Sequence, residues 1–230
     1  MSELESTGKF DKMSIETDED EHSLEMHLPY LYKVLSRSFP DGPASFPPLI
    51  PILVGATVPN VERSFGSIFA PYLRDPSSVF IISSDFCHWG LRFRYTYYLP
   101  NAPTGASTSS AASLPDPNSG HSLNSSSRAP TSPAIHESIA AMDKMAMNAI
   151  EGGKHKDFLK NLNDTGNTVC GRHPIGVMMA TIERVEQEDG WDAENDGKKG
   201  RFQFVRYERS SDVVKIGDSS VSYASAFVVL

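Results

Sequence analysis

The chain has 230 residues, a formal net charge of −8 and only two cysteines. That length suits one large domain with an ample hydrophobic core. The acidic balance argues against binding of nucleic acid, which needs clustered Lys and Arg, and no stretch approaches the roughly 20 apolar residues of a membrane helix. Two cysteines cannot build a disulfide framework, so we expect reduced thiols and a cytoplasmic protein, with the nucleus as the alternative location.

The negative charge is concentrated near the start of the sequence. Residues 1–30 contain nine acidic and two basic side chains, whereas the remaining 200 residues are nearly neutral. Such a charge run is typical of a solvated acidic leader. A helix is predicted over Ser23–Arg37, where leucines recur at helical spacing although Pro29 interrupts them.

Apolar patterns predict the later elements in chain order. Short apolar runs bounded by turn residues predict buried strands, and apolar positions at helical spacing predict helices. The predicted strands are Leu49–Val54, Val79–Ile82, Phe202–Tyr207 and Val221–Val229, and the predicted helices are Val61–Leu73, Ile135–Ile150 and Pro174–Glu188. Strands that alternate with helices favour an α/β fold, a central mixed sheet flanked by helices, within a single domain over residues 1–230.

Two polar segments interrupt this pattern. Residues 99–133 hold ten Ser and six Pro, and their few apolar residues show no period, so we expect a disordered insertion. Residues 189–200 form a second polar segment that contains glycine, which predicts a loop.

The first candidate site lies in the sequence DEHSLEMH, residues 20–27. Carboxylates gather here with two imidazoles, and His22 and Glu25 are candidate ligand contacts. Carboxylate and imidazole are the material of metal sites and of acid–base pairs. The alternative is a well-capped acidic helix start with incidental histidines.

The second candidate site follows the predicted strand Val79–Ile82. Ligands in open α/β sheets bind beyond the carboxyl ends of strands, so Asp85 and His88 are candidates for an orienting carboxylate and a proton-transfer imidazole. Trp89 would wall this pocket, and Arg92 follows close by. The alternative is a loop whose aromatic side chains cover the sheet edge.

The third candidate site surrounds Cys170, which precedes the helix expected from Pro174. The helix N-terminus together with Arg172 and His173 would lower the pKa of the Cys170 thiol, giving a thiolate suited to metal binding or nucleophilic attack. The alternative is a small buried hydrophobic residue. The sequence leaves open whether Cys170 joins His88 in a nucleophile set or in a metal site.

Three segments together resemble one protein family. TDEDEHSLEMHLPY (17–30), SSDFCHWGLRFRYTYY (83–98) and CGRHPIGV (170–177) resemble the MEMO family, mediators of cell motility. The resemblance implies a fold like that of the LigB-type class III extradiol non-haem iron dioxygenases. It implies a pocket for iron or copper in which Cys170 is a metal ligand and His88, beside Asp85, is the pocket histidine.

The chain also departs from the family pattern. The Pro-His-Ala-Gly and Ser-His-His stretches, which carry the family's two metal-binding histidines, do not occur in it. We therefore expect an N-terminally incomplete domain with an incomplete metal site, since three or four protein ligands are typical.

The resemblance implies a protein that binds iron or copper and acts in redox balance and motility signalling through protein contacts, with phosphotyrosine-type peptides among its ligands. The alternatives are a metal-dependent oxidoreductase or dioxygenase, and an inactive truncated fragment.

Overall fold

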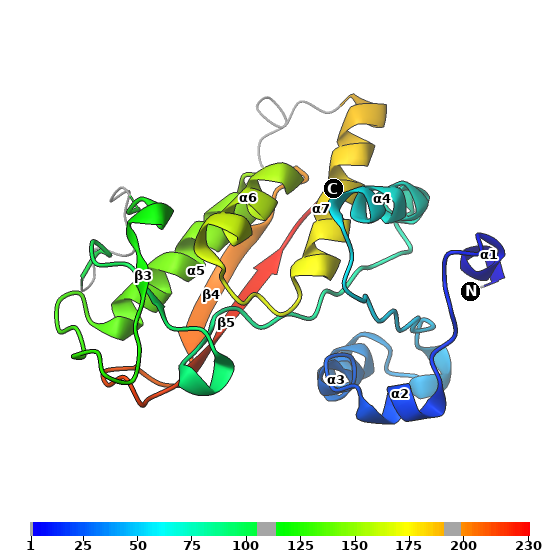
Figure 1. Cartoon of the computed structure of the whole chain (residues 1–230). Helices are drawn as coiled ribbons and strands as arrows, with labels where there is room; N and C mark the ends of the chain where they lie inside the picture. Colours follow the sequence, from blue (N-terminus) through cyan, green and yellow to red (C-terminus); the bar gives the residue numbers. More distant parts are fainter. Residues whose placement is uncertain (1, 105–113, 191–198) are drawn as a thin grey trace. The chain divides into compact units, whose positions relative to one another are not determined.

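The computed structural model describes residues 2–104, 114–190 and 199–230. Within it the chain divides into two compact units, Met1–Gly55 and Ala56–Leu230 (Figure 1), which are described separately below. The described residues mix helices with small sheets, which confirms the prediction of helix and strand in one chain.

The first unit is helical. Its elements are α1 (Ser2–Ser6), α2 (Ile15–Asp20), the short 3-10 helix η1 (Glu25–His27), α3 (Leu28–Ser38) and the 3-10 helix η2 (Pro43–Ser45). The helix expected over Ser23–Arg37 is therefore divided at its start. Pro29 lies in the first turn of α3, where a missing backbone N–H costs nothing, so it begins the helix rather than breaking it.

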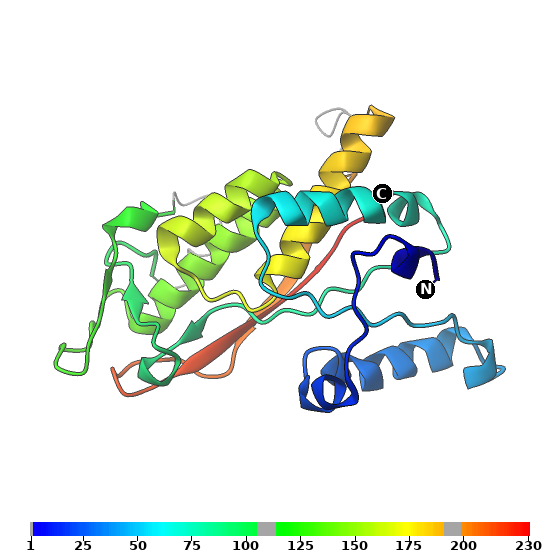
Figure 2. The same cartoon turned by 45° about the vertical axis from the view of Figure 1, so that its right-hand side comes forward.

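Four longer helices shape the second unit. They are α4 (Pro59–Arg74), α5 (Ile135–Glu151), α6 (His155–Thr165) and α7 (Arg172–Asp189). Three of them confirm predicted helices, whereas α6 was missed because it carries few apolar residues. Figures 1 and 2 show α4 lying across α7 and α6 alongside α5. No helix in the described part of the chain is long and apolar enough to cross a membrane.

The described strands form two small antiparallel sheets rather than the mixed sheet expected. In the first, β5 (Ser220–Phe227) pairs on one side with β4 (Gln203–Arg209) and on the other with β1 (His88–Trp89). The second joins β2 (Tyr97–Tyr98) to β3 (His121–Ser122). The 3-10 turns η3 (Leu91–Phe93) and η5 (Pro117–Ser119) complete the unit. Both strands predicted near the C-terminus, now β4 and β5, are confirmed.

The strands predicted at Leu49–Val54 and Val79–Ile82 are wrong, since neither segment is a strand in the structure. A strand needs a partner backbone as well as apolar side chains. Neither segment pairs with a strand in the described part of the chain, and Val79 is 85% exposed. Asp85 consequently does not follow a buried strand; it precedes the short stretch that pairs with β5.

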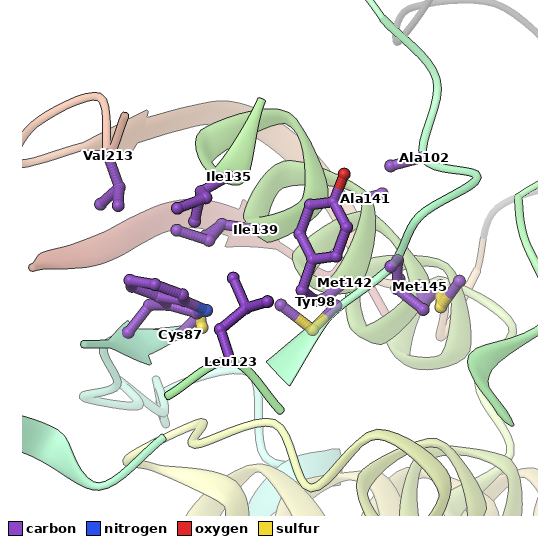
Figure 3. Packing of buried hydrophobic residues seen from close by; sticks show 12 residues of the cluster. Cys87, Tyr98, Ala102, Leu123, Ile135, Ile139, Ala141, Met142, Met145 and Val213 are labelled. Atoms are coloured by element: carbon purple, nitrogen blue, oxygen red, sulfur yellow. The ribbon is translucent and has the colours of Figure 1, made fainter. Parts of the chain in front are cut away.

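The hydrophobic core is built on both ends of α5. Ile135, Ile139 and Met142 pack with Cys87 in one cluster (Figure 3). Met147 and Ile150 pack in a second cluster with further apolar residues, Phe86, Ala146, Phe158, Val169, Ile175 and Met179. The 86–89 stretch contributes side chains to both clusters, because successive side chains of an extended chain point to opposite sides.

Both flanks of the Ser- and Pro-rich range 99–133 contribute to this core. Leu99 is fully buried, and Ala102 and Leu123 are nearly so. The composition did not indicate this contribution. Residues 105–113 lie outside the described residues, as do residues 191–198 of the polar segment predicted at 189–200.

Gly66 sets the close approach of α4 to α7. A Cβ atom at this position would lie 2.9 Å from the backbone atoms Ala180 C and Thr181 N, which cannot rotate away. We predict that Gly66→Ala lowers the free energy of unfolding, because overpacking against backbone costs about 1–3 kcal/mol and outweighs the gain in helix propensity of up to about 1 kcal/mol. Urea unfolding measures the change.

Gly217→Ala is the matched control, because a Cβ atom there would meet nothing within 4 Å. Equal stability of the two alanine variants would contradict the close packing of α4 on α7.

Candidate functional site

The second and third segments singled out in the sequence lie side by side in the structure. The backbone N–H of Cys170 donates to the carbonyl oxygen of Asp85 at 3.0 Å, and that of His88 donates to Thr168 Oγ1 at 2.7 Å. The N–H of Gly171 donates to Ser84 Oγ at 2.9 Å, and a Cβ atom at Gly171 would overlap the carbonyl of Ser83. Glycine is therefore required where the two segments touch.

Residues 84–88 and 168–171 thus meet in a junction, and Asp85, His88 and Cys170 flank it. His88 Nε2 lies 3.6 Å from Asp85 Oδ2, and His88 Nδ1 lies 3.3 Å from the carbonyl oxygen of Thr168. Since a carbonyl only accepts, Nδ1 carries the proton and donates to Thr168. The Nε2 nitrogen then faces the Asp85 carboxylate, where it can carry a proton directed at Oδ2 or bind a metal ion instead.

The prediction of a lowered thiol pKa at Cys170 is wrong. Partial desolvation of the sulfur and the negative charge of Asp85 raise the pKa of this thiol instead, although the residue as a whole is exposed. The cationic neighbours expected to lower it are directed elsewhere, because Arg172 donates to His173 Nε2 at 3.3 Å and His173 contacts Glu62. Cys170 is exposed, so it is also not the buried hydrophobic residue of the alternative interpretation.

Trp89 and Arg92 differ in their surroundings. Trp89 is fully buried in the core and donates from Nε1 to the carbonyl of Tyr97 at 2.9 Å, so it does not wall an open pocket. Arg92 is exposed, and its guanidinium carbon lies 4.4 Å from the ring centre of Phe93. Phe93 in turn packs edge-on against the ring of His88, which places Arg92 near the junction.

His22 and Glu25 belong to the first unit, Met1–Gly55. The neighbouring Glu21 carboxylate accepts from the backbone N–H groups of Leu24 and Glu25 at 2.9 and 3.0 Å, and from the hydroxyl of Ser23. This is the arrangement of a capped helix start, which favours the structural interpretation of the DEHSLEMH segment.

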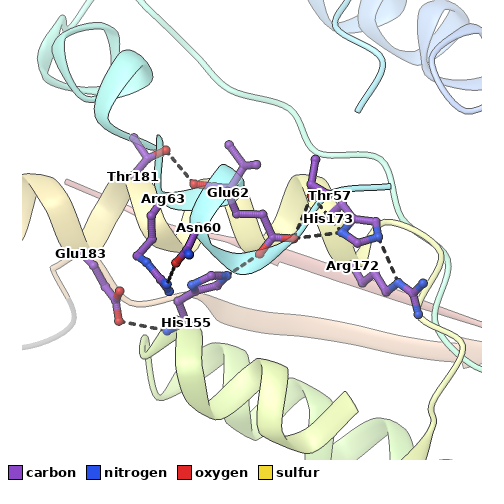
Figure 4. A network of polar contacts seen from close by, with 10 residues as sticks. Thr57, Asn60, Glu62, Arg63, His155, Arg172, His173, Thr181 and Glu183 are labelled. Carbon is purple, nitrogen blue, oxygen red and sulfur yellow. Dashed lines mark hydrogen bonds and ion pairs between the residues drawn. The ribbon is translucent and has the colours of Figure 1, made fainter. Parts of the chain in front are cut away.

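The structure contains a buried carboxylate cluster that the sequence did not indicate. The carboxylate of Glu62 on α4 accepts from His155 Nε2 at 2.6 Å, from His173 Nδ1 at 2.9 Å and from Thr57 Oγ1 at 3.0 Å (Figure 4). Burial alone would raise the pKa of Glu62, but these hydrogen bonds outweigh it and lower the pKa. A charged residue on the apolar face of α4 was the available signal.

A cavity of about 230 Å³ opens beside this cluster. Leucines and a proline form part of its wall, and polar side chains complete it; the lining residues are Thr57, Pro59, Glu62, Leu159, Leu162, Asn163, Arg172 and His173. It holds His173 and Arg172 of the predicted site, but Asp85, His88 and Cys170 do not line it.

A second buried carboxylate, Asp143 on α5, lies beneath the junction. Its Oδ1 accepts from the backbone N–H of Cys87 at 3.1 Å and from Asn167 Nδ2 at 3.0 Å, and its Oδ2 accepts from the Tyr207 hydroxyl at 2.8 Å. Burial raises the pKa of this carboxyl, and the hydrogen bonds act in the opposite direction. Asp143 thus joins α5, the 86–89 stretch and β4.

Metal ligands are scarce at these positions. Within residues 2–104, 114–190 and 199–230, no group of three or more His, Cys, Asp or Glu side chains is arranged to hold a metal ion. The thiol of Cys170 and Nε2 of His88 are the donors of the predicted site. The donors described here therefore do not amount to a closed metal cage, for which three or four protein ligands are typical.

We predict that Asp143→Ala lowers the free energy of unfolding by roughly 2–6 kcal/mol, because it leaves two buried donors, the N–H of Cys87 and the side-chain amide of Asn167, without an acceptor. Chemical denaturation measures this. Asp157→Ala, at an exposed position in the first turn of α6, is the control and costs less than about 1 kcal/mol. Equal losses in both variants would contradict the role of Asp143.

The charge of Asp85 is expected to control the reactivity of Cys170. Asp85→Asn removes the negative charge that raises the thiol pKa, so the pH profile of Cys170 alkylation shifts to lower pH and the rate near pH 8 rises severalfold. Mass spectrometry after iodoacetamide treatment measures this, with buried Cys87 as the silent internal reference. An unshifted profile would show that the two side chains do not interact.

Comparison with known sequences identifies the family of this chain. Residues 1–227 match the family described as Memo-like protein. The chain is 40% identical over 223 residues to Protein MEMO1 of Homo sapiens, 39% over 228 residues to that of Xenopus laevis and 37% over 229 residues to that of Danio rerio.

These alignments cover 97%, 99% and 100% of this chain but 61%, 62% and 63% of the relatives, in the same order. The chain therefore spans less than two thirds of the length of these relatives. The match over residues 1–227 includes all three motifs that carried the resemblance, and the chain belongs to the Memo-like protein family.

Proposed function

We propose that this chain is a LigB-type dioxygenase-like scaffold that works in redox balance and motility signalling through protein contacts and binds iron or copper weakly at Cys170 and His88. The observation that carries the proposal is the junction itself. There an exposed thiol lies close to the Asp85 carboxylate, which lies 3.6 Å from the imidazole Nε2 of His88. Family membership supports the same scaffold.

The chemistry of the donors supports iron or copper. Thiolate and imidazole are ligands that Cu(I) and Fe(II) accept, whereas harder cations prefer oxygen. When bound, such a metal would supply one-electron redox chemistry. The described residues lack a group of three His, Cys, Asp or Glu side chains that could hold it firmly.

The residues of the junction have roles that do not depend on a metal. Thr168 orients His88 by accepting from Nδ1, so that Nε2 faces Asp85. Asp85 favours the protonated form of the Cys170 thiol. The site thus keeps the thiol in its less reactive form until a partner or ligand neutralises Asp85.

A phosphotyrosine-type peptide remains a proposed ligand of this face. Arg92 is exposed, stacks on Phe93 and reaches the junction through the contact of Phe93 with His88. A guanidinium in this position suits a phosphate group, which Arg binds through two parallel hydrogen bonds.

Weak metal binding is tested by anaerobic titration of the full chain with Cu(I) and with Fe(II). We predict less than one equivalent bound after gel filtration, because two donors do not retain a metal as three or four do. Cys170→Ser is predicted to abolish the remaining binding, and Cys87→Ser, which alters a fully buried thiol, to leave it unchanged.

Either of two results would contradict the proposal. Tight binding of a full equivalent would show a complete site, and binding that is indifferent to Cys170→Ser would place the metal elsewhere.

A further inference from the structure

The cluster of Glu62, His155 and His173 has no role in the contacts that form the junction. The side chains of Glu62 and His155 are only 2% and 1% exposed, yet their polar atoms are directed at each other at 2.6 Å. Burying a carboxylate costs free energy unless it is fully hydrogen-bonded, and Glu62 receives three hydrogen bonds. Because the burial of this carboxylate costs free energy, the cluster points to a function beyond packing.

Hydrogen-bond directions assign the state of His173. Its Nε2 accepts from Arg172 Nε at 3.3 Å, so Nε2 carries no proton. Its Nδ1 lies 2.9 Å from Glu62 Oε1, and because a carboxylate only accepts, Nδ1 carries the proton. His173 therefore carries a proton on Nδ1, which also lies 3.0 Å from Thr57 Oγ1. By the same argument, His155 carries a proton on Nε2, which donates to Glu62 Oε2.

His173 is tied to the turn that carries Cys170. It lies in the first turn of α7, where the N–H of Arg172 donates to the carbonyl of Val169 and that of Ile175 donates to Gly171. These bonds make residues 169–175 one hydrogen-bonded turn. The position of His173 therefore sets the position of Cys170 in the same turn.

The first half of α7 packs closely against Glu62. A Cβ atom at Gly176 would lie 2.7 Å from Glu62 Oε2 and 3.2 Å from His155 Nε2. The helix thus rests directly on the carboxylate and imidazole, and Thr57 closes the remaining side by donating to Oε1.

We infer that Glu62 and His155 are positioning residues for Cys170: they hold His173 as the Nδ1-protonated tautomer and thereby fix the 169–175 turn beside Asp85. This inference rests on the proposed function only in taking Cys170 as the working group of the site. Neither residue touches Cys170: Glu62 acts through His173, and His155 acts through Glu62.

Nitrogen-15 NMR of the histidine side chains of the unmodified full chain tests the tautomer at neutral pH. We expect His173 to be protonated on Nδ1 alone and His155 to be protonated on Nε2. A His173 ring protonated on Nε2 would overturn the inference, and this measurement needs no variant to fold.

Alkylation of Cys170 tests the positioning. In Glu62→Gln the amide has one accepting oxygen for two imidazole donors, so one hydrogen bond is lost. Cys170 is already exposed, so the effect comes from a looser 169–175 turn that lets the thiol move away from the Asp85 carboxylate. The alkylation rate is expected to rise on the order of threefold to tenfold, the factor that corresponds to the loss of one hydrogen bond. Thr57→Val, which removes a single donor to Oε1, is expected to give a smaller rise in the same direction.

Glu186→Gln is the matched control, because this residue of α7 pairs with Arg201 at 3.0 Å and with Lys154 at 3.8 Å rather than with Glu62, His155 or His173. It is expected to leave the rate unchanged. An unchanged rate in Glu62→Gln, or an equal rise in Glu186→Gln, would overturn the inference.

The two proposals fail separately. Metal binding that ignores Cys170→Ser would remove the proposed function while the tautomer and the alkylation rates still decide the positioning. An unchanged alkylation rate in Glu62→Gln would remove the positioning and leave the metal titration to decide the function.

Discussion

The buried carboxylate of Asp143 is the constraint on which the second unit depends. It is fully buried, and its partners come from the 86–89 stretch, from Asn167 and from Tyr207 of β4. Because a buried carboxylate must be satisfied by hydrogen bonds, these segments have to meet at one point. The Tyr207 hydroxyl also lies 3.2 Å from Ser222 Oγ, which extends the same network to β5.

The candidate site follows from that meeting point. Fixing the N–H of Cys87 places Asp85 and His88 on either side of it, and fixing Asn167 places the next residue, Thr168, against His88. Cys170 then reaches Asp85 through the backbone. The Glu62 cluster acts on the opposite side of the same turn, through His173. The junction is thus held between two buried carboxylates, one on α5 and one on α4.

The parts of the fold that were predictable from the sequence are those with strong local signals. Apolar spacing together with Pro174 in a first turn predicted α7, and similar spacing predicted α4 and α5. The strand predicted at Val79–Ile82 failed because strand formation depends on a partner that the local sequence does not identify. The α6 helix was missed because its apolar side chains are few, with Phe158 alone among them fully buried.

The sequence indicated candidate residues for the site but not the contacts that set their chemistry. Asp85 and His88 stood out because polar side chains follow an apolar run. All three residues, Asp85, His88 and Cys170, lie in segments that resemble family motifs. Their spacing does not show that Asp85 would raise the pKa of Cys170, since that depends on a contact across more than eighty residues. Glu62 and Asp143 were missed because apolar spacing can place a carboxylate on the buried face of a helix but does not identify the donors that stabilise it there.

Amide hydrogen exchange of Cys87 tests the central claim most directly. This N–H donates to Asp143 within the core. If Asp143 holds the segments together, the amide exchanges only when the unit unfolds, and its exchange depends on denaturant as steeply as global unfolding does. Exchange through a local opening that is insensitive to denaturant would contradict the account, because the 86–89 stretch would then move independently of Asp143.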